Sequence, residues 1–153
     1  MKISIVIDTD KQIILRHKIR KIYRNDHIDF KPLMKDMKVK YVVADKGYDS
    51  KENRNYVYWN LKAMPEIPYR KTSGLTKLRG AFRSLFVDEK IYHQRSKIET
   101  VFSVIKRKYG SILRNKSLKT QKIELISKLI VYNIERTLCY FYCLFRGLHQ
   151  SLF

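Results

Sequence analysis

The chain has 153 residues, about the length of one globular domain. Its 33 Lys and Arg residues outnumber its 14 Asp and Glu residues, which gives a formal net charge of +19. Because no fold requires such an excess and self-repulsion opposes it, the charge points to a polyanionic partner, most simply nucleic acid. A hydrophobic content of 44% and an aromatic content of 12% exclude a disordered basic tail.

The two cysteines and the N-terminal segment predict a cytoplasmic protein. Cys139 and Cys143 are too few for a disulfide framework, and no signal-like segment precedes the first turn residues. No second pair of ligands lies near them, so we expect small apolar side chains rather than a metal site. Residues 125–145 are the most hydrophobic part of the chain, but three charged residues interrupt them, so no membrane contact is expected.

The first part of the chain predicts a β-hairpin, a helix and a buried strand. Apolar and polar residues alternate over 3–7 and again over 13–19, with turn residues between the two segments. One face of this hairpin is basic, through Arg16, Lys18 and Arg20. Asp29 or the residue before it is placed to cap a helix over 30–37. The apolar run 39–44 has the length of a buried strand.

The remaining elements give an α/β order with two helices at the end. Asp49 and Glu52 are spaced as a capping box, which predicts a helix over 50–60. A short strand over 62–64 and an irregular basic connection over 65–90 follow. Helical periodicity then predicts helices over 92–108, ended by Gly110, and over 118–145.

Two carboxylates occupy positions that suit chemistry. Asp45 follows the predicted buried strand 39–44, where α/β sheets present ligands and catalytic groups, although an Asp before a Gly-containing turn is also a common turn former. Glu99 lies in the helix 92–108. At 100° per residue, Tyr92, Arg95 and Lys106 fall with Glu99 on a stripe about 60° wide. Periodicity alone does not separate this stripe from an ordinary solvated face.

The spacing Tyr92-x2-Arg95-x3-Glu99-x6-Lys106 resembles the YREK signature of one large group of DDE transposases from bacterial and archaeal insertion sequences. The segment Val42-Val-Ala-Asp-Lys-Gly-Tyr-Asp-Ser50 resembles the one that carries the second catalytic Asp in these enzymes. Further similar segments are Asn25-Asp26, Ile67-Pro-Tyr-Arg70, Phe102 to Gly110 and the Lys128 to Arg136 helix with Tyr132-Asn133. The resemblance extends over residues 2–138.

The resemblance implies an α/β fold of the ribonuclease H type, a mixed sheet flanked by helices with further helices at the C-terminus. It implies Asp45 and Glu99 as catalytic ligands of two Mg²⁺ or Mn²⁺ ions, in a reaction that cuts and transfers DNA strands. It also implies double-stranded transposon ends as the partner, and a homo-oligomer is possible. Tyr92 and Arg95 would contact phosphate near the cut, and Lys106 would hold the transposon end. Candidates for further backbone contacts are Arg16, Lys18, Arg20, Arg70, Lys71 and Arg107.

The chain departs from the family pattern at the first catalytic Asp. Only two predicted strands precede Asp29, whereas the family has three, and the first of those carries the first Asp. Either that strand is missing from an N-terminally truncated chain or Asp8 takes its place. We therefore expect a partial catalytic domain over 1–138, followed by a hydrophobic aromatic tail over 139–153. That tail packs back on the domain, mediates self-association, or is an out-of-frame end.

Two functions follow. The first is DNA transposition, a form of recombination, by a transposase catalytic fragment whose cleavage is impaired by truncation. The alternative is a non-catalytic basic DNA-binding fragment that interferes with an intact transposase. Both predict DNA binding that weakens with salt.

Overall fold

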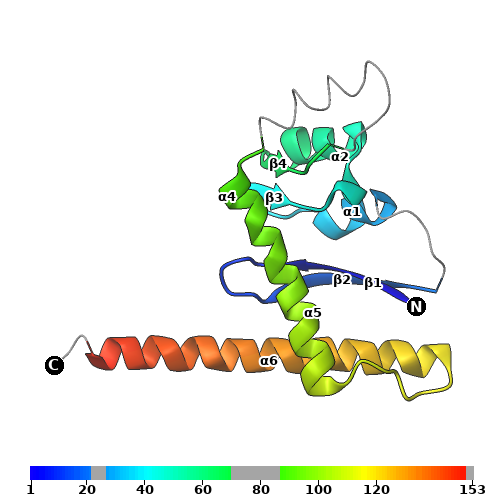
Figure 1. Ribbon diagram of the computed structural model, residues 1–153, viewed down its shortest axis with the longest axis vertical. Coiled ribbons are helices and arrows are strands. Elements are labelled where there is room, and N and C mark those ends of the chain that lie inside the picture. Colours follow the sequence, from blue (N-terminus) through cyan, green and yellow to red (C-terminus); the bar gives the residue numbers. More distant parts are fainter. Residues whose placement is uncertain (22–26, 70–86, 151–153) are drawn as a thin grey trace. The chain divides into compact units, whose positions relative to one another are not determined.

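The computed structural model describes residues 1–21, 27–69 and 87–150 (Figure 1). The strands are β1 (Lys2–Ile7), β2 (Ile14–Arg20), β3 (Tyr41–Val43) and β4 (Met64–Glu66). The helices are α1 (His27–Met34), α2 (Lys51–Asn55), α4 (Glu89–Tyr92), α5 (Ser96–Tyr109) and α6 (Leu118–Gln150), with the short turns η1 (Lys46–Tyr48), η2 (Tyr56–Asn60) and η3 (His93–Arg95). The predicted order of strands and helices and the mixed α/β class are confirmed. The predicted connection falls largely on 70–86, outside the described residues.

The chain forms two compact units. The first unit comprises Met1–Val6 and His17–Ser96, and the second comprises Ile7–Arg16 and Lys97–Phe153. The strands pair in two two-stranded sheets, β1 with β2 and β3 with β4. A single mixed sheet of the ribonuclease H type therefore stays a prediction.

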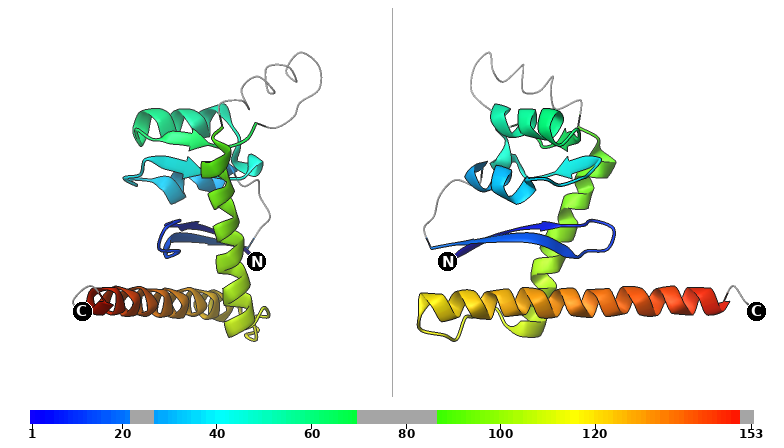
Figure 2. Two further views of the ribbon diagram at one scale, coloured as in Figure 1. Left: turned by 60° about the vertical axis from the view of Figure 1, so that its left-hand side comes forward. Right: turned by 180° about the vertical axis from the view of Figure 1, so that it is seen from behind.

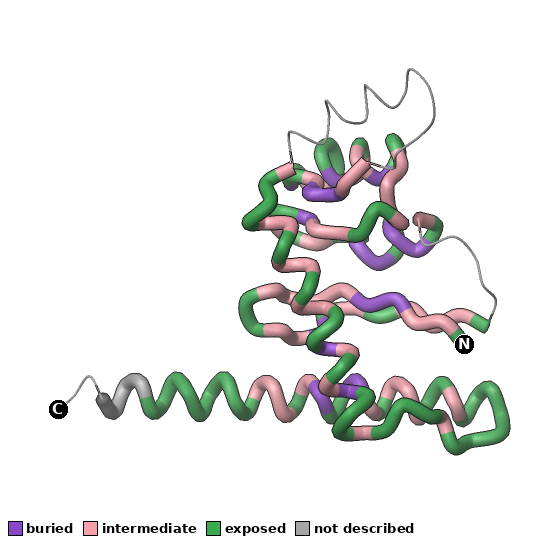
Figure 3. The backbone as a smooth tube through the Cα atoms, viewed as in Figure 1, coloured by how far each residue is buried: buried purple, intermediate pink, exposed green. Residues whose placement is uncertain are grey.

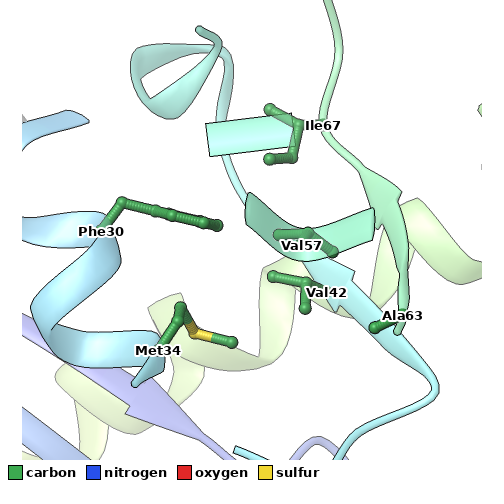
Figure 4. Close-up of a cluster of buried hydrophobic side chains, with 6 residues drawn as sticks. All are labelled: Phe30, Met34, Val42, Val57, Ala63 and Ile67. Atoms are coloured by element: carbon green, nitrogen blue, oxygen red, sulfur yellow. The ribbon is translucent and has the colours of Figure 1, made fainter. Parts of the chain in front are cut away.

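The core of the first unit surrounds a parallel strand pair. β3 and β4 pair in parallel, with Val42 opposite Pro65, and α2 and η2 form the crossover between them. Parallel strands need such a crossover, and it covers one face of the pair. The buried cluster around them contains Phe30, Met34, Val42, Val57, Ala63 and Ile67 (Figure 4). Val57 and Ile67 have no exposed surface, so each contributes about 1.5–3 kcal/mol to stability.

The helix predicted over 50–60 is capped one residue later than expected. The Ser50 hydroxyl accepts a hydrogen bond from the Asn53 amide at 3.0 Å, and α2 then gives way to the π-helical turn η2. The capping box predicted from Asp49 and Glu52 is wrong, because Asp49 accepts from Arg54 Nε at 2.9 Å instead. Ser50 also lies one residue closer to the helix, in the extended conformation that an N-cap requires.

A buried carboxylate neutralises part of the basic face predicted for the hairpin. Asp29 is 1% exposed and forms ion pairs with Arg20 and, at 3.3 Å, with Lys18. The helix α1 begins at His27, so Asp29 lies within its first turn rather than at the cap expected for a helix over 30–37. A buried carboxylate needs such partners, because desolvation of an unpaired charge is costly. Two of the three basic side chains of that face therefore have a structural role.

In the second unit, α6 holds the tip of the hairpin through its side chains. Asn133 Oδ1 accepts from the Ile14 amide at 2.9 Å, and Asn133 Nδ2 donates to the Ile14 carbonyl at 2.8 Å. The Tyr132 hydroxyl donates to the Gln12 carbonyl at 2.9 Å, and Tyr132 is 2% exposed. The side-chain amide of Asn133 thus forms with Ile14 the two hydrogen bonds that a neighbouring strand would otherwise form.

The connection between α5 and α6 is fixed at both of its ends. Gly110 follows α5 with a φ of +84°, the left-handed conformation that ends helices, as the sequence predicts. Glu124 accepts hydrogen bonds from the Arg114 amide at 3.0 Å and from Asn115 Nδ2 at 2.7 Å. From Leu118, α6 continues without a break past the predicted boundary at residue 138 (Figure 2).

Replacing Asn133 by Ala removes both hydrogen bonds to Ile14 and leaves its amide and carbonyl groups unpaired. We expect the free energy of unfolding to fall by about 1–3 kcal/mol, measured by urea unfolding. Ser103→Ala, at an exposed position of α5, is the control and should change it by less than about 0.5 kcal/mol. Equal losses in the two variants would contradict the role given to Asn133.

Glu124 should make the stability of the chain sensitive to acid. Although burial opposes it, hydrogen bonds from Asn115 and Lys128 lower the pKa of Glu124 from its ordinary value of 4.5. A carboxyl group whose pKa is lower in the folded state stabilises that state above pH 4.5, and this contribution disappears as the pH falls through the folded-state pKa. Glu124→Gln should therefore lower the free energy of unfolding at pH 7 but much less at pH 3. A difference that is independent of pH would contradict this.

Candidate active site

Asp45 lies at the carboxyl end of the parallel strand pair. Ala44, after the last residue of β3, donates its amide to the Glu66 carbonyl at 3.4 Å, and Asp45 follows. Its Oδ1 accepts from the Lys46 amide at 2.7 Å and caps the turn η1, so the turn-forming interpretation is confirmed. Asp45 is nevertheless exposed. The carboxylate therefore stands at the edge of the sheet where α/β proteins bind their ligands.

Arg54 connects the chain after Asp45 to the chain after β4. Its Nε donates to Asp49 Oδ1 at 2.9 Å, and its Nη2 donates to the Ile67 carbonyl. The guanidinium group also lies over the Tyr69 ring, 3.5 Å from its centroid. With 13% of its side chain exposed, Arg54 is an internal brace of the first unit rather than a cation offered to a ligand.

Glu66 is a buried carboxylate that the sequence did not single out. It lies on β4 opposite Val43, is 4% exposed, and accepts the Asp88 amide through Oε2 at 2.9 Å. Asp88 in turn caps α4 by accepting from the Lys90 amide at 2.9 Å. Glu66 thereby fixes where the helical segment with Tyr92 and Arg95 begins. The available signal was one acidic residue in an apolar stretch, just beyond the strand predicted over 62–64.

The structure brings Tyr92 and Arg95 together. α4 ends at Tyr92, and η3 is a 3₁₀ turn, in which side chains three residues apart are eclipsed. The Arg95 guanidinium accordingly lies 6.0 Å from the centroid of the Tyr92 ring. The prediction of one continuous α-helix over 92–108 is wrong at this turn. Three residues of 3₁₀ helix precede α5, so Tyr92 does not keep the angular position that a continuous α-helix would give it.

Within α5 apolar and polar side chains lie on different faces. Val101 is fully buried and Ile105 is 5% exposed. Glu99 and Lys106 are both exposed, and seven residues of α-helix return them to the same side. The candidate active-site carboxylate of this helix thus lies on its polar face.

The candidate residues divide between the two units. Asp45, Tyr92 and Arg95 belong to the first unit, whereas Glu99, Lys106 and Arg107 belong to the second. Among the described residues, no cluster of three or more His, Cys, Asp or Glu side chains is positioned to hold a metal ion. Carboxylate oxygens are nonetheless the donors that Mg²⁺ and Mn²⁺ prefer, so Asp45 and Glu99 fit such ions chemically.

Asp8 has a structural role in the hairpin turn. Its Oδ1 accepts from the Asp10 amide at 2.8 Å and from the Lys11 amide at 3.0 Å, which closes the turn between β1 and β2. The Asp8 amide also donates to the Ile13 carbonyl at 2.9 Å. These bonds account for an Asp at this position without a catalytic role.

Some of the candidate basic residues form ion pairs within the chain, and others do not. Lys106 and Arg107 are exposed and form no ion pair with another described residue, whereas the adjacent Lys108 lies 2.6 Å from Glu135 and lowers the pKa of that carboxyl group. Lys18 and Arg20 are bound to Asp29. Arg70, Lys71 and Asn25-Asp26 lie outside the described residues.

No helix in the described ranges has the length and apolar character to cross a membrane.

Comparison with known proteins supports the same family as the motifs. The family model described as Transposase DDE domain matches residues 1–134, from the start of the chain into α6. No curated protein and no solved structure matches the chain. Since the matched segment includes Asp45 and every residue of the Tyr92 to Lys106 signature, the family assignment rests on the part of the chain that carries the candidate site. The chain belongs to the DDE transposase domain family.

Proposed function

We propose that this chain acts in DNA transposition, as the catalytic part of a transposase of the YREK group that cuts and transfers DNA strands at transposon ends. The observation that carries the proposal is the exposed carboxylate of Asp45 at the carboxyl end of the β3–β4 pair, in a chain that also has the complete Tyr92, Arg95, Glu99 and Lys106 spacing. The family match supports it, because that match includes both. We further propose a ribonuclease H-like fold and a place on the bacterial or archaeal nucleoid.

In this proposal two side chains bind the metal ions and two others bind the DNA. Asp45 and Glu99 would hold Mg²⁺ or Mn²⁺, which supply activation of water or a DNA 3′-hydroxyl and charge stabilisation at the leaving oxygen. The hydrogen bond from the Lys46 amide orients one oxygen of Asp45 and leaves the carboxylate exposed to a ligand. Tyr92 and Arg95 would bind a phosphate together, since their side chains already lie side by side.

Lys106 and Arg107 would hold the DNA end from the exposed face of α5. Two adjacent cations without an ion-pair partner among the described residues are ready to exchange their counterions for phosphates. The third carboxylate is Asp8 or a residue outside this chain. The turn that Asp8 closes favours the second choice, because its Oδ1 already accepts two backbone amides.

Nicking of a labelled duplex that carries a transposon end tests the reaction. We expect cleavage with Mg²⁺ or Mn²⁺ and none with a chelator. Asp45→Asn and Glu99→Gln should each lower the rate about 10²–10⁴-fold, because a metal-held carboxylate is worth several kcal/mol in the transition state. Glu52→Gln and Asp10→Asn, at exposed acidic positions of the two units, should keep the wild-type rate.

The outcomes of this assay separate the alternatives. Cleavage that survives Asp45→Asn would overturn the proposed active site. Cleavage that is also lost in Asp8→Asn, in a variant that keeps its fold, would make Asp8 the first carboxylate. Tight binding without cleavage would favour the second candidate, a non-catalytic fragment that competes with an intact transposase for DNA.

The salt dependence of DNA binding tests the basic face of α5. Lys106→Ala and Arg107→Ala should each weaken binding and reduce the slope of log K against log salt by about 1, since each removes one phosphate contact. Lys108→Ala is the matched control, because the same charge is lost from a side chain already paired with Glu135. It should change the slope much less. Equal changes in all three variants would indicate a general effect of net charge and contradict specific contacts.

A further inference from the structure

We propose that Tyr58 and Trp59, together with Lys62, bind single-stranded DNA by stacking their rings on unpaired bases. These three residues are here called the η2 platform, after the turn η2 that carries the two rings. The platform rests on the proposed function for one point only, which is that the partner is DNA. It lies in the first unit, and none of its residues belongs to the candidate active site.

The two rings of the η2 platform are large, adjacent and exposed. Trp59 is 72% exposed and Tyr58 is 53% exposed. Val57, in the same turn, is fully buried, whereas the three residues that follow it are exposed (Figure 3). The turn therefore contributes one side chain to the core and presents its aromatic rings to the outside, where large amphipathic rings are typical of binding surfaces.

The rings are already arranged for stacking. Their centroids are 4.9 Å apart and their planes are at 88° to each other. In this edge-to-face arrangement the edge of one ring meets a face of the other, so most of both ring surfaces stays uncovered. Each ring also restricts the rotamers of its neighbour, which lowers the ordering cost when a ligand binds. Every nucleobase has a flat face, so any of the four bases can stack here.

Hydrogen bonds of the backbone hold the rings at the surface. η2 is a π-helical turn, in which the Leu61 amide donates to the Tyr56 carbonyl at 3.2 Å. Such turns are rare and occur frequently at functional sites. The Ala63 amide donates to the Val57 carbonyl at 3.1 Å, which fixes the chain just before β4. The two rings are therefore carried by a hydrogen-bonded turn next to the buried core.

Lys62 adds an exposed positive charge three residues after Trp59. Its φ is +52°, in the left-handed region where Gly and Asn are the ordinary residues. A lysine at this position is therefore better explained by its side chain than by its backbone. Lys62 forms no ion pair with another described residue, and residues 56–65 include no acidic residue. Its ammonium group is thus available to a phosphate.

The surrounding charge favours a nucleic-acid strand over a protein partner. Lys38 and Lys40 are exposed just before β3, and Asp36 is the one acidic residue of 35–41. The Lys40 carbonyl accepts the Met64 amide at 2.9 Å, so this basic segment meets the chain just after Lys62. Aromatic rings for the bases and cations for the phosphates are the combination that single-strand-binding surfaces use. The bases of a duplex are stacked on each other, so only unpaired bases can use both.

The η2 platform is separate from the edge that carries Asp45. Asp45 follows β3 and lies at the carboxyl end of the β3–β4 pair, whereas η2 leads into the amino end of β4. Because the two strands are parallel, these are opposite ends of the pair. A strand on the η2 platform would therefore contact a different part of the first unit from one held at Asp45.

Tryptophan fluorescence tests the stacking, because Trp59 is the single tryptophan of the chain. The full chain is titrated, without metal, with a short single-stranded oligothymidylate. We expect saturable quenching of the emission, since a stacked base quenches an indole ring. The same strand annealed to oligodeoxyadenylate should bind with little quenching. Binding of the single strand, followed by anisotropy, without any quenching would overturn the proposal.

Substitutions test the role of each side chain. Trp59→Ala should weaken single-strand binding about 10-fold, because one stacked base is lost, and should leave duplex binding unchanged. Trp59→Phe keeps an aromatic ring and should retain most of the affinity. Lys62→Asn removes the charge but suits the left-handed backbone, and it should lower the slope of log K against log salt by about 0.7. Urea unfolding checks that each variant keeps its fold.

Tyr142→Ala is the matched control, because Tyr142 is 61% exposed and lies on α6. It should leave single-strand binding unchanged. An equal loss in Tyr142→Ala, or an equal loss of duplex binding in Trp59→Ala, would contradict stacking on the η2 platform. Duplex binding without single-strand binding would overturn the platform and leave transposition supported, whereas binding of neither would contradict both.

Discussion

The hydrogen bond from the Asp88 amide to the buried Glu66 carboxylate fixes the arrangement of the candidate site in the first unit. Glu66 lies on β4, next to the strand that leads to Asp45, and Asp88 caps the helix that leads to Tyr92. A buried carboxylate that accepts a backbone amide is costly to remove, since its loss leaves that amide unpaired. Glu66 thus connects the strand pair that precedes Asp45 to the helix that ends at Tyr92, although it is not itself a candidate for binding a ligand.

Other carboxylates of this very basic chain also hold parts of its fold together. With only 14 acidic residues for 33 basic ones, most of those described have a structural partner. Asp29 neutralises two hairpin cations, Asp49 holds Arg54, and Glu124 holds the connection before α6. Asp45 differs from these, because its carboxylate is exposed and its bond is to the adjacent amide. This contrast supports a ligand-binding role for Asp45 more than its sequence position alone does.

The elements that depend on local patterns were predictable, and those that depend on distant partners were not. Alternation located the hairpin, and Gly110 located the end of α5, because both signals act within a few residues. The position of Asp45 after β3 followed from one apolar run. The partner of Glu66 is 22 positions away and that of Asp29 is 9 positions away. The periodicity of the sequence does not indicate such contacts. The turn η3 was missed because 3₁₀ turns are frequent at helix ends, and no local signal in residues 93–95 distinguished this turn from the α-helix that follows.

The contact between Asn133 and Ile14 also bears on how the chain avoids misassembly. The edge of a two-stranded sheet offers unpaired amide and carbonyl groups to any passing strand. The Asn133 side chain occupies both groups of Ile14, and the Tyr132 hydroxyl occupies the Gln12 carbonyl nearby. These side chains of α6 therefore occupy backbone groups that another strand would otherwise bind, and they offer no further backbone for a sheet to grow on. Shortening the chain before residue 132 would remove them and expose β2 to edge-to-edge aggregation.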